Sequence, residues 1–114
     1  MIREQSSEKA VAEIERCAQD KRFVQVLMLV MGDMPLGKRH YWPIYAAAER
    51  LGLPIGIHAG SAYHHPPSSV GWGPYHIEDY VAPAQAFQTQ LTSLSDEGVF
   101  ATHPKRKRVI RDSG

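Results

Sequence analysis

The chain has 114 residues, of which 43% are hydrophobic, and its formal net charge is +1. This length allows one domain with a modest core, and the near-neutral charge excludes a general attraction to nucleic acid or to an acidic membrane. The single cysteine, Cys17, excludes an internal disulfide and predicts a reducing, cytoplasmic setting. Met1 to Asp20 lacks the apolar core of a secretory signal, and no apolar run approaches the roughly 20 residues of a membrane span.

The first predicted element is an amphipathic helix from Ser7 to Asp20. Apolar residues recur in it at three- and four-residue spacing, which is the pattern of a helix with one buried face. Ser6 or Ser7 can accept a hydrogen bond from the first turn, and Glu8 lies near the positive end of the helix dipole. We therefore expect a capped helix that packs one face on the domain.

Three short segments are predicted to be strands. Phe23 to Val30 is almost entirely apolar, which is typical of a parallel strand covered by helices on both sides, or of a barrel strand. Leu53 to His58 forms the second predicted strand and Lys107 to Arg111 the third.

Two further helices are predicted between these strands. The first covers "YWPIYAAAERLGLP", with Pro43 tolerated in its first turn and Gly52 at its end. The second runs from about Ile77 to Glu97. Pro83 lies in its interior, so we expect a kink or a later helix start.

The predicted order of elements is α, β, α, β, α, β. This alternation indicates the α/β fold class, with a parallel sheet and right-handed crossovers. Three parallel strands leave two edges and one poorly covered face, whereas a closed (β/α)8 barrel needs about 250 residues. We therefore expect residues 1–114 to form a single incomplete domain, a partial TIM barrel of about three strands from the middle of a larger enzyme.

Polar residues follow or end each predicted strand, at Asp33, His58 and Asp112. In parallel α/β folds, ligands bind beyond the carboxyl ends of the strands. A neutral imidazole suits a divalent metal, and a carboxylate suits a metal or proton transfer. Each residue also has a structural interpretation. His58 can bind a backbone carbonyl, Asp33 can form an Asx turn, which is the interpretation we favour, and Asp112 can cap a following helix.

The long loop from Ala59 to Tyr75 is a second candidate region, because loops of this length in compact domains are usually functional. Tyr63, His64 and Trp72 are candidates for contacts with a bound substrate. His64 and His65 are adjacent, and adjacent side chains diverge, so we do not expect both to bind one metal ion. Solvated loop positions are the alternative for both histidines.

Other basic residues carry no functional prediction. His40 and His103 lie at element ends, and the sequence implies no partner for either. Lys105 to Arg108 has the composition of a nucleic-acid patch, but it leads directly into a strand. A solvated loop between a helix and a strand is the preferred interpretation.

Three phrases resemble consecutive middle segments of the amidohydrolase-related metal-dependent hydrolases: "PIYAAAERLGLPIGIHAG", "FQTQLTSLSDEGVF" and "KRKRVIRDSG". This group includes aminocarboxymuconate-semialdehyde decarboxylase, and the likeness extends from about Arg22 over nearly the whole chain. The resemblance implies a (β/α)8 barrel that holds a divalent metal, usually zinc, at its C-terminal face. Members hydrolyse C–N or C–O bonds of small molecules or decarboxylate aromatic acids.

The resemblance also implies roles for individual residues. His58 matches the metal-binding histidine at the end of the family's fifth strand. The last strand would be the sixth, where many members carry a second histidine. Here "RDSG" offers Asp112, which resembles the "ESG" ending of one subgroup and is our catalytic candidate. The family's first-strand His-x-His pair and eighth-strand aspartate have no counterpart in the chain.

The sequence thus supports a metal-dependent hydrolase, or a related lyase, with a small-molecule substrate and no nucleic-acid or membrane partner. We expect the chain by itself to be inactive, because a catalytic zinc normally needs three protein ligands. Two alternatives remain open: a non-catalytic α/β binding module, and a truncated pseudo-enzyme that completes a partner chain. Self-association into a homo-oligomer is a further expectation.

Overall fold

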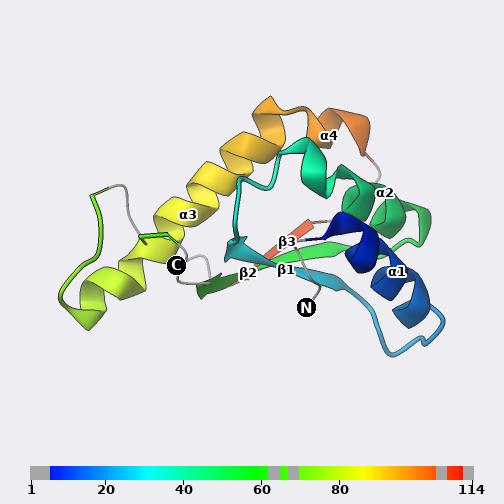
Figure 1. The fold of residues 1–114 in the computed structure, drawn as a ribbon, viewed down its shortest axis with the longest axis horizontal. Coiled ribbons are helices and arrows are strands. Elements are labelled where there is room, and N and C mark those ends of the chain that lie inside the picture. The colour runs from blue at the N-terminus through cyan, green and yellow to red at the C-terminus, as the bar shows by residue number, and fades with distance from the viewer. Residues whose placement is uncertain (1–5, 62–64, 67–69, 105–107, 112–114) are drawn as a thin grey trace.

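The fold is an α/β arrangement with one parallel sheet (Figure 1). The computed structural model describes residues 6–61, 65–66, 70–104 and 108–111. In chain order the elements are α1 (Ser7–Cys17), β1 (Val26–Met31), η1 (Arg39–Tyr41), α2 (Trp42–Arg50), β2 (Ile55–Ser61), α3 (His76–Asp96), α4 (Val99–Thr102) and β3 (Arg108–Arg111). The strands pair in the order β1-β2-β3. This confirms the α/β class and the parallel pairing, and the described residues form an open sheet.

Helix α1 has the predicted cap but ends three residues early. Ser6 Oγ accepts a hydrogen bond from Lys9 N at 3.4 Å, as expected of an N-cap. At the other end, the Asp20 carboxylate accepts hydrogen bonds from the backbone N–H and the guanidinium of Arg22. The helix stops at Cys17, because this local turn competes with helical hydrogen bonding.

Helix α2 follows its sequence signals closely. A short 3-10 turn, η1, leads into Trp42, and Pro43 lies in the first turn of the α-helix. Gly52 follows the helix with a φ of +68°, a left-handed conformation that suits glycine.

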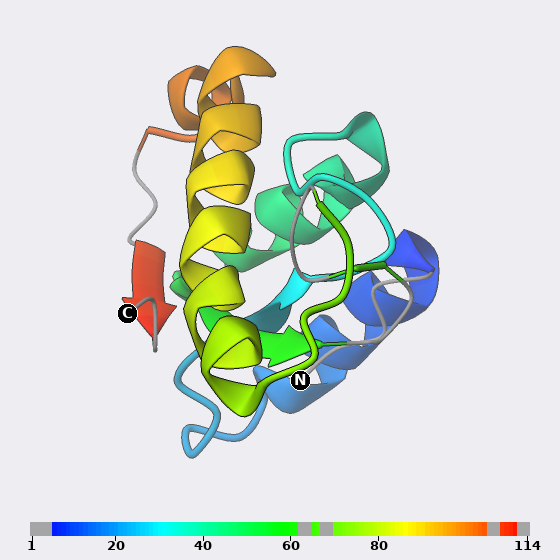
Figure 2. The same cartoon turned by 90° about the vertical axis from the view of Figure 1, so that its left-hand side faces the viewer.

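Helix α3 matches the predicted range, from about Ile77 to Glu97, to within one residue at each end. It starts at His76, where the Glu78 carboxylate accepts a hydrogen bond from Tyr75 N at 2.9 Å, and it continues through Pro83 to Asp96. Figure 2 shows it crossing in front of the sheet as one continuous helix. Of the two alternatives that Pro83 raised, the later start does not occur, because the hydrogen bond between Tyr75 and Glu78 caps the first turn.

Strand β2 extends beyond its predicted end. The register pairs Val26 with Ile55 and Leu29 with His58, and it then pairs Met31 with Ser61. Between the last two pairs β1 advances by two residues and β2 by three, so β2 carries a bulge. His58 therefore lies inside the strand and not at its end, because pairing with β1 continues past it.

The two faces of the sheet differ in burial. Partners in a parallel ladder project to the same face, and one face is the core. Its residues are at most 4% exposed and pack against apolar residues of α1, α2 and α3. They are Val26, Met28, Val30, Ile55 and Ile57. The second face consists of Leu27, Leu29, Gly56, His58 and Gly60, and its larger side chains are only half-buried.

The loop between β1 and η1 is fastened to α3 by a row of side chains. Gln90 is 7% exposed, and its Oε1 accepts from Leu36 N at 2.6 Å while its Nε2 donates to Val30 O at 2.7 Å. One turn further on, Ser93 Oγ accepts from Gly37 N at 3.0 Å. A side chain at position 37 would clash, because its Cβ would lie 2.2 Å from the Ser93 carbonyl oxygen.

The same row continues to the end of α3. Glu97 Oε1 lies 2.7 Å from Lys38 Nζ, and this hydrogen bond lowers the pKa of Glu97. The spacing of three and four residues places Gln90, Ser93 and Glu97 on one face of the helix, the face that contacts the loop. We call these three residues the α3 row.

His103, for which the sequence implied no partner, is paired with Glu49. Its Nδ1 lies 2.6 Å from Glu49 Oε2, and the residue is 8% exposed. Its ring also meets Trp42 edge-on, with the ring centroids 6.1 Å apart. This part-buried pair joins α2 to the residue that follows α4.

Substitution of Gln90 tests the α3 row. Gln90→Leu keeps the side-chain size but removes both partners from the Leu36 N–H and the Val30 carbonyl. We expect the free energy of unfolding to fall by about 2–4 kcal/mol in urea denaturation. The exposed neighbour Gln88 is the matched control, and Gln88→Leu should change the free energy of unfolding by less than about 0.5 kcal/mol. Equal effects would contradict the assigned role.

The Glu49–His103 pair generates a second prediction. Glu49→Ala removes a part-buried charge-assisted hydrogen bond and should lower the free energy of unfolding by about 1.5–3 kcal/mol in urea denaturation. Glu15→Ala is the control, because the Glu15–Arg50 ion pair also holds α2 but its side chains are half exposed. Glu15→Ala should lower the free energy of unfolding by less than about 1 kcal/mol. Equal losses in the two variants would show that the Glu49–His103 pair does not contribute more than a surface ion pair.

Candidate metal and substrate site

His58 projects from the second face of the sheet. It pairs with Leu29 on β1 and with Arg111 on β3, so it lies at a level where all three strands are in register. Gly56 and Gly60 flank it at two-residue spacing on the same face, and the imidazole is half-buried. The imidazole therefore stands between two positions that carry no side chain.

The His58 ring has a defined orientation. Its Nδ1 is hydrogen-bonded to the carbonyl oxygen of Ala59. A carbonyl oxygen can only accept, so in the neutral imidazole Nδ1 carries the proton and Nε2 has the lone pair. Hydrogen bonding to a backbone carbonyl was the structural interpretation of His58, and metal-binding histidines commonly use the same arrangement. The geometry is therefore compatible with both.

The described residues offer one candidate ligand of a metal centre, His58, and not a complete set. No three His, Cys, Asp or Glu side chains within the described ranges lie close enough to share a metal ion. A catalytic zinc normally takes three protein ligands. His58 fits one of these positions by its chemistry and tautomer. Asp112 follows β3 directly in the sequence but lies outside the described residues.

The predicted substrate contacts are only partly described. Tyr63 and His64 lie outside the described residues. Trp72 is exposed and lines a small hollow of about 280 Å³ beside the start of α3. His65 reaches back toward β1, with Nε2 3.3 Å from the carbonyl oxygen of Asp33. The loop after β2 thus touches the loop after β1 at the carboxyl edge of the sheet.

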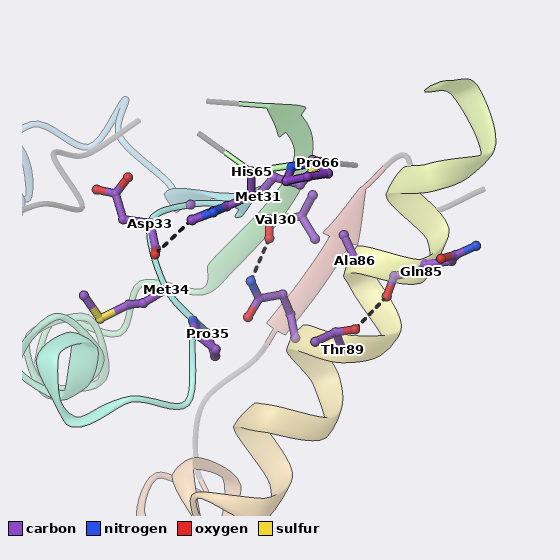
Figure 3. Close-up of a pocket in the computed structure, with 12 residues that line it drawn as sticks. Val30, Met31, Asp33, Met34, Pro35, His65, Pro66, Gln85, Ala86 and Thr89 are labelled. Atoms are coloured by element: carbon purple, nitrogen blue, oxygen red, sulfur yellow. Dashed lines mark hydrogen bonds between the residues drawn. The ribbon is translucent and has the colours of Figure 1, made fainter. Parts of the chain in front are cut away.

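A larger pocket lies at this same edge, between the end of β1 and α3 (Figure 3). Its volume is about 530 Å³. It is lined by Val30, Met31, Gly32, Asp33, Met34, Pro35, His65, Pro66, Gln85, Ala86, Thr89 and Gln90. Of the two predicted strand-end residues that are described, Asp33 lines it and His58 does not, and Figure 3 shows the Asp33 carboxylate directed away from α3. We call this the edge pocket.

Sequence reasoning missed the edge pocket and Gln90. The α3 residues that line it lie more than 50 positions from β1 in the sequence, so no local spacing links them. One signal was available. Gln90 lies three residues after the buried Phe87 on the apolar face of α3, and a polar residue at such a position needs buried partners.

Comparison with known proteins places the chain in a family. A family model described as amidohydrolase matches residues 1–112, which is nearly the whole chain. No curated protein matches the sequence. None of the helices within the described ranges combines the length and apolar character that a membrane crossing requires. The match agrees with the resemblance of the three sequence phrases, and the chain therefore belongs to the amidohydrolase family.

Proposed function

We propose that this chain supplies part of a metal-dependent hydrolase centre that cleaves C–N or C–O bonds in a small organic molecule. Decarboxylation, as in the aminocarboxymuconate-semialdehyde decarboxylase-like subgroup, is the related alternative. The observation that carries the proposal is His58, an imidazole on the second face of a parallel sheet whose Nδ1 is held by the Ala59 carbonyl. Membership of the amidohydrolase family supports the reaction class.

The second face supports the view that the sheet belongs to a barrel. Gln25 Nε2 is buried, yet it has no hydrogen-bond partner among the described residues. The Gln25 amide occupies the space beside Gly56, where a Cβ would lie 1.4 Å from this nitrogen. A buried donor of this kind calls for an acceptor from a segment that covers the face. We propose that Gln25, Leu29 and His58 face the interior of a (β/α)8 barrel.

Each candidate residue has a proposed task. His58 would hold a divalent metal, zinc by family expectation, through Nε2, and Ala59 fixes the plane of its ring. When bound, the metal would polarise a carbonyl or activate a water. Asp112 follows Arg111, which is in register with His58, so its carboxylate would hold or move a proton at the same edge. Tyr63, His64 and Trp72 would cover the substrate from the long loop.

The chain alone would lack activity, because one imidazole and one carboxylate fall short of three metal ligands. Its partners in this proposal are a small-molecule substrate and a second chain, either a complementing chain or another copy in a homo-oligomer. The alternative, a non-catalytic module that completes a partner, uses the same second face. A cytoplasmic setting stays a prediction that rests on the single cysteine.

Zinc titration tests the role of His58. The chain should bind zinc in calorimetry, and His58→Ala should weaken binding by about tenfold or more, since loss of even an outer partner of a ligand costs that much. His76→Ala is the control, because His76 is an exposed histidine at the start of α3 and should leave binding unchanged. Unaltered binding in His58→Ala would overturn the assignment.

An activity assay tests the prediction that the chain alone is inactive. The pure chain, loaded with zinc, should not accelerate the hydrolysis of simple amides or esters, because the described residues supply too few metal ligands. The assay compares the chain with His58→Ala. Turnover that requires both zinc and His58 would show that the chain is a complete catalyst.

A further inference from the structure

The edge pocket has the size and composition of a small-molecule site. Its volume of about 530 Å³ lies within the range of about 300–1,000 Å³ that is typical of ligand pockets. Val30, Met31, Pro35 and Ala86 give it mainly apolar walls. The α3 row holds the loop that forms one wall, so this wall is fixed in place by the hydrogen bonds of Gln90 and Ser93.

The pocket offers no positive charge that would attract an anion. No Lys or Arg occurs among its described lining residues. His65 is engaged with the backbone carbonyl of Asp33 at the rim, and the Asp33 carboxylate points away from α3 in Figure 3. An anionic group would lose its hydration here without gaining a cationic partner, and such a transfer is costly.

Gln90 supplies a polar group of fixed orientation in the lining. A carboxamide has two N–H donors and two acceptor lone pairs on its oxygen. In Gln90 one donor binds the Val30 carbonyl, and one lone pair accepts from Leu36 N. These two partners decide which end of the amide is oxygen and which is nitrogen. Each end of this buried amide can therefore form one further hydrogen bond.

We propose that the edge pocket binds an uncharged, largely apolar ring that carries one amide or hydroxyl group, and that it discriminates against the corresponding carboxylate. The ring would pack between Pro35 and Ala86, and its polar group would pair with the remaining donor and acceptor of Gln90. The edge pocket lies on the helix-covered side of the sheet and His58 does not line it, so it is a second site and the inference does not rest on the proposed function.

Binding of three probes of similar size tests the charge preference. Benzamide, benzoate and benzylamine are neutral, anionic and cationic at neutral pH. Each would be titrated, without metal, into the isotopically labelled chain, with the backbone amide signals of Ala86 and Thr89 as the readout. We expect benzamide to shift these signals saturably and to bind about fivefold or more tightly than benzoate. Equal or tighter benzoate binding, or no benzamide binding, overturns the proposal.

Replacement of two alanines by phenylalanine tests whether benzamide binds in the edge pocket. Ala86→Phe fills the edge pocket and should abolish benzamide binding, whereas Ala101→Phe on the exposed surface of α4 should not affect it. If Ala86→Phe disturbs the fold, Thr89→Phe narrows the same pocket from its exposed side. Benzamide binding that survives the filled pocket places the ligand elsewhere and overturns the proposal.

The outcome is separable from that of the proposed function. The probe titration contains no zinc, and His58 does not line the edge pocket. Zinc binding that depends on His58 without benzamide binding would refute only the pocket inference. Benzamide binding at Ala86 without zinc binding would refute only the metal centre.

Discussion

The geometry of the carboxyl edge of this sheet depends on the carboxamide of Gln90. This amide joins α3 to the end of β1 and to the loop that follows it, through the Val30 carbonyl and the Leu36 N–H. On the other side of the loop, the hydroxyl of Tyr45 donates to the Leu36 carbonyl at 2.6 Å. Both backbone polar groups of Leu36 are thus hydrogen-bonded, which is why this residue can be fully buried outside a helix or strand.

The sheet is asymmetric in a way that links packing to chemistry. The helix-facing side is filled with apolar side chains, and its residues are close-packed in a single cluster. The second face has two glycines on β2, and the side chains of Gln25 and Leu29 occupy the space beside Gly56 and Gly60. The close-packed core thus lies on one face, and the other face carries the half-buried imidazole of His58. This division is typical of barrels, whose interiors and exteriors alternate along every strand.

Local signals predicted much of this structure, and the misses share one physical cause. Helix α2 was bounded by Pro43 and Gly52, which act on their own backbone. The end of β2, by contrast, depends on pairing with β1, and the partner of His103 lies 54 residues away at Glu49. His58 was selected for its imidazole chemistry and a predicted strand-end position. The structure places it inside β2, and its role as a metal ligand stays a prediction. The roles of Asp112, Tyr63 and His64 stay predictions, since they lie outside the described residues.

The bulge in β2 explains how His58 can lie within a strand and still mark where regular structure ends. Up to the Leu29–His58 pair, successive residues of β2 alternate strictly between the two faces. Beyond it, β2 uses three residues to reach Ser61 where β1 uses two to reach Met31, so one residue of β2 is extra to the ladder. Such a bulge bends its strand and increases the local twist. Deletion of one residue between His58 and Ser61 would therefore straighten β2 at its carboxyl end.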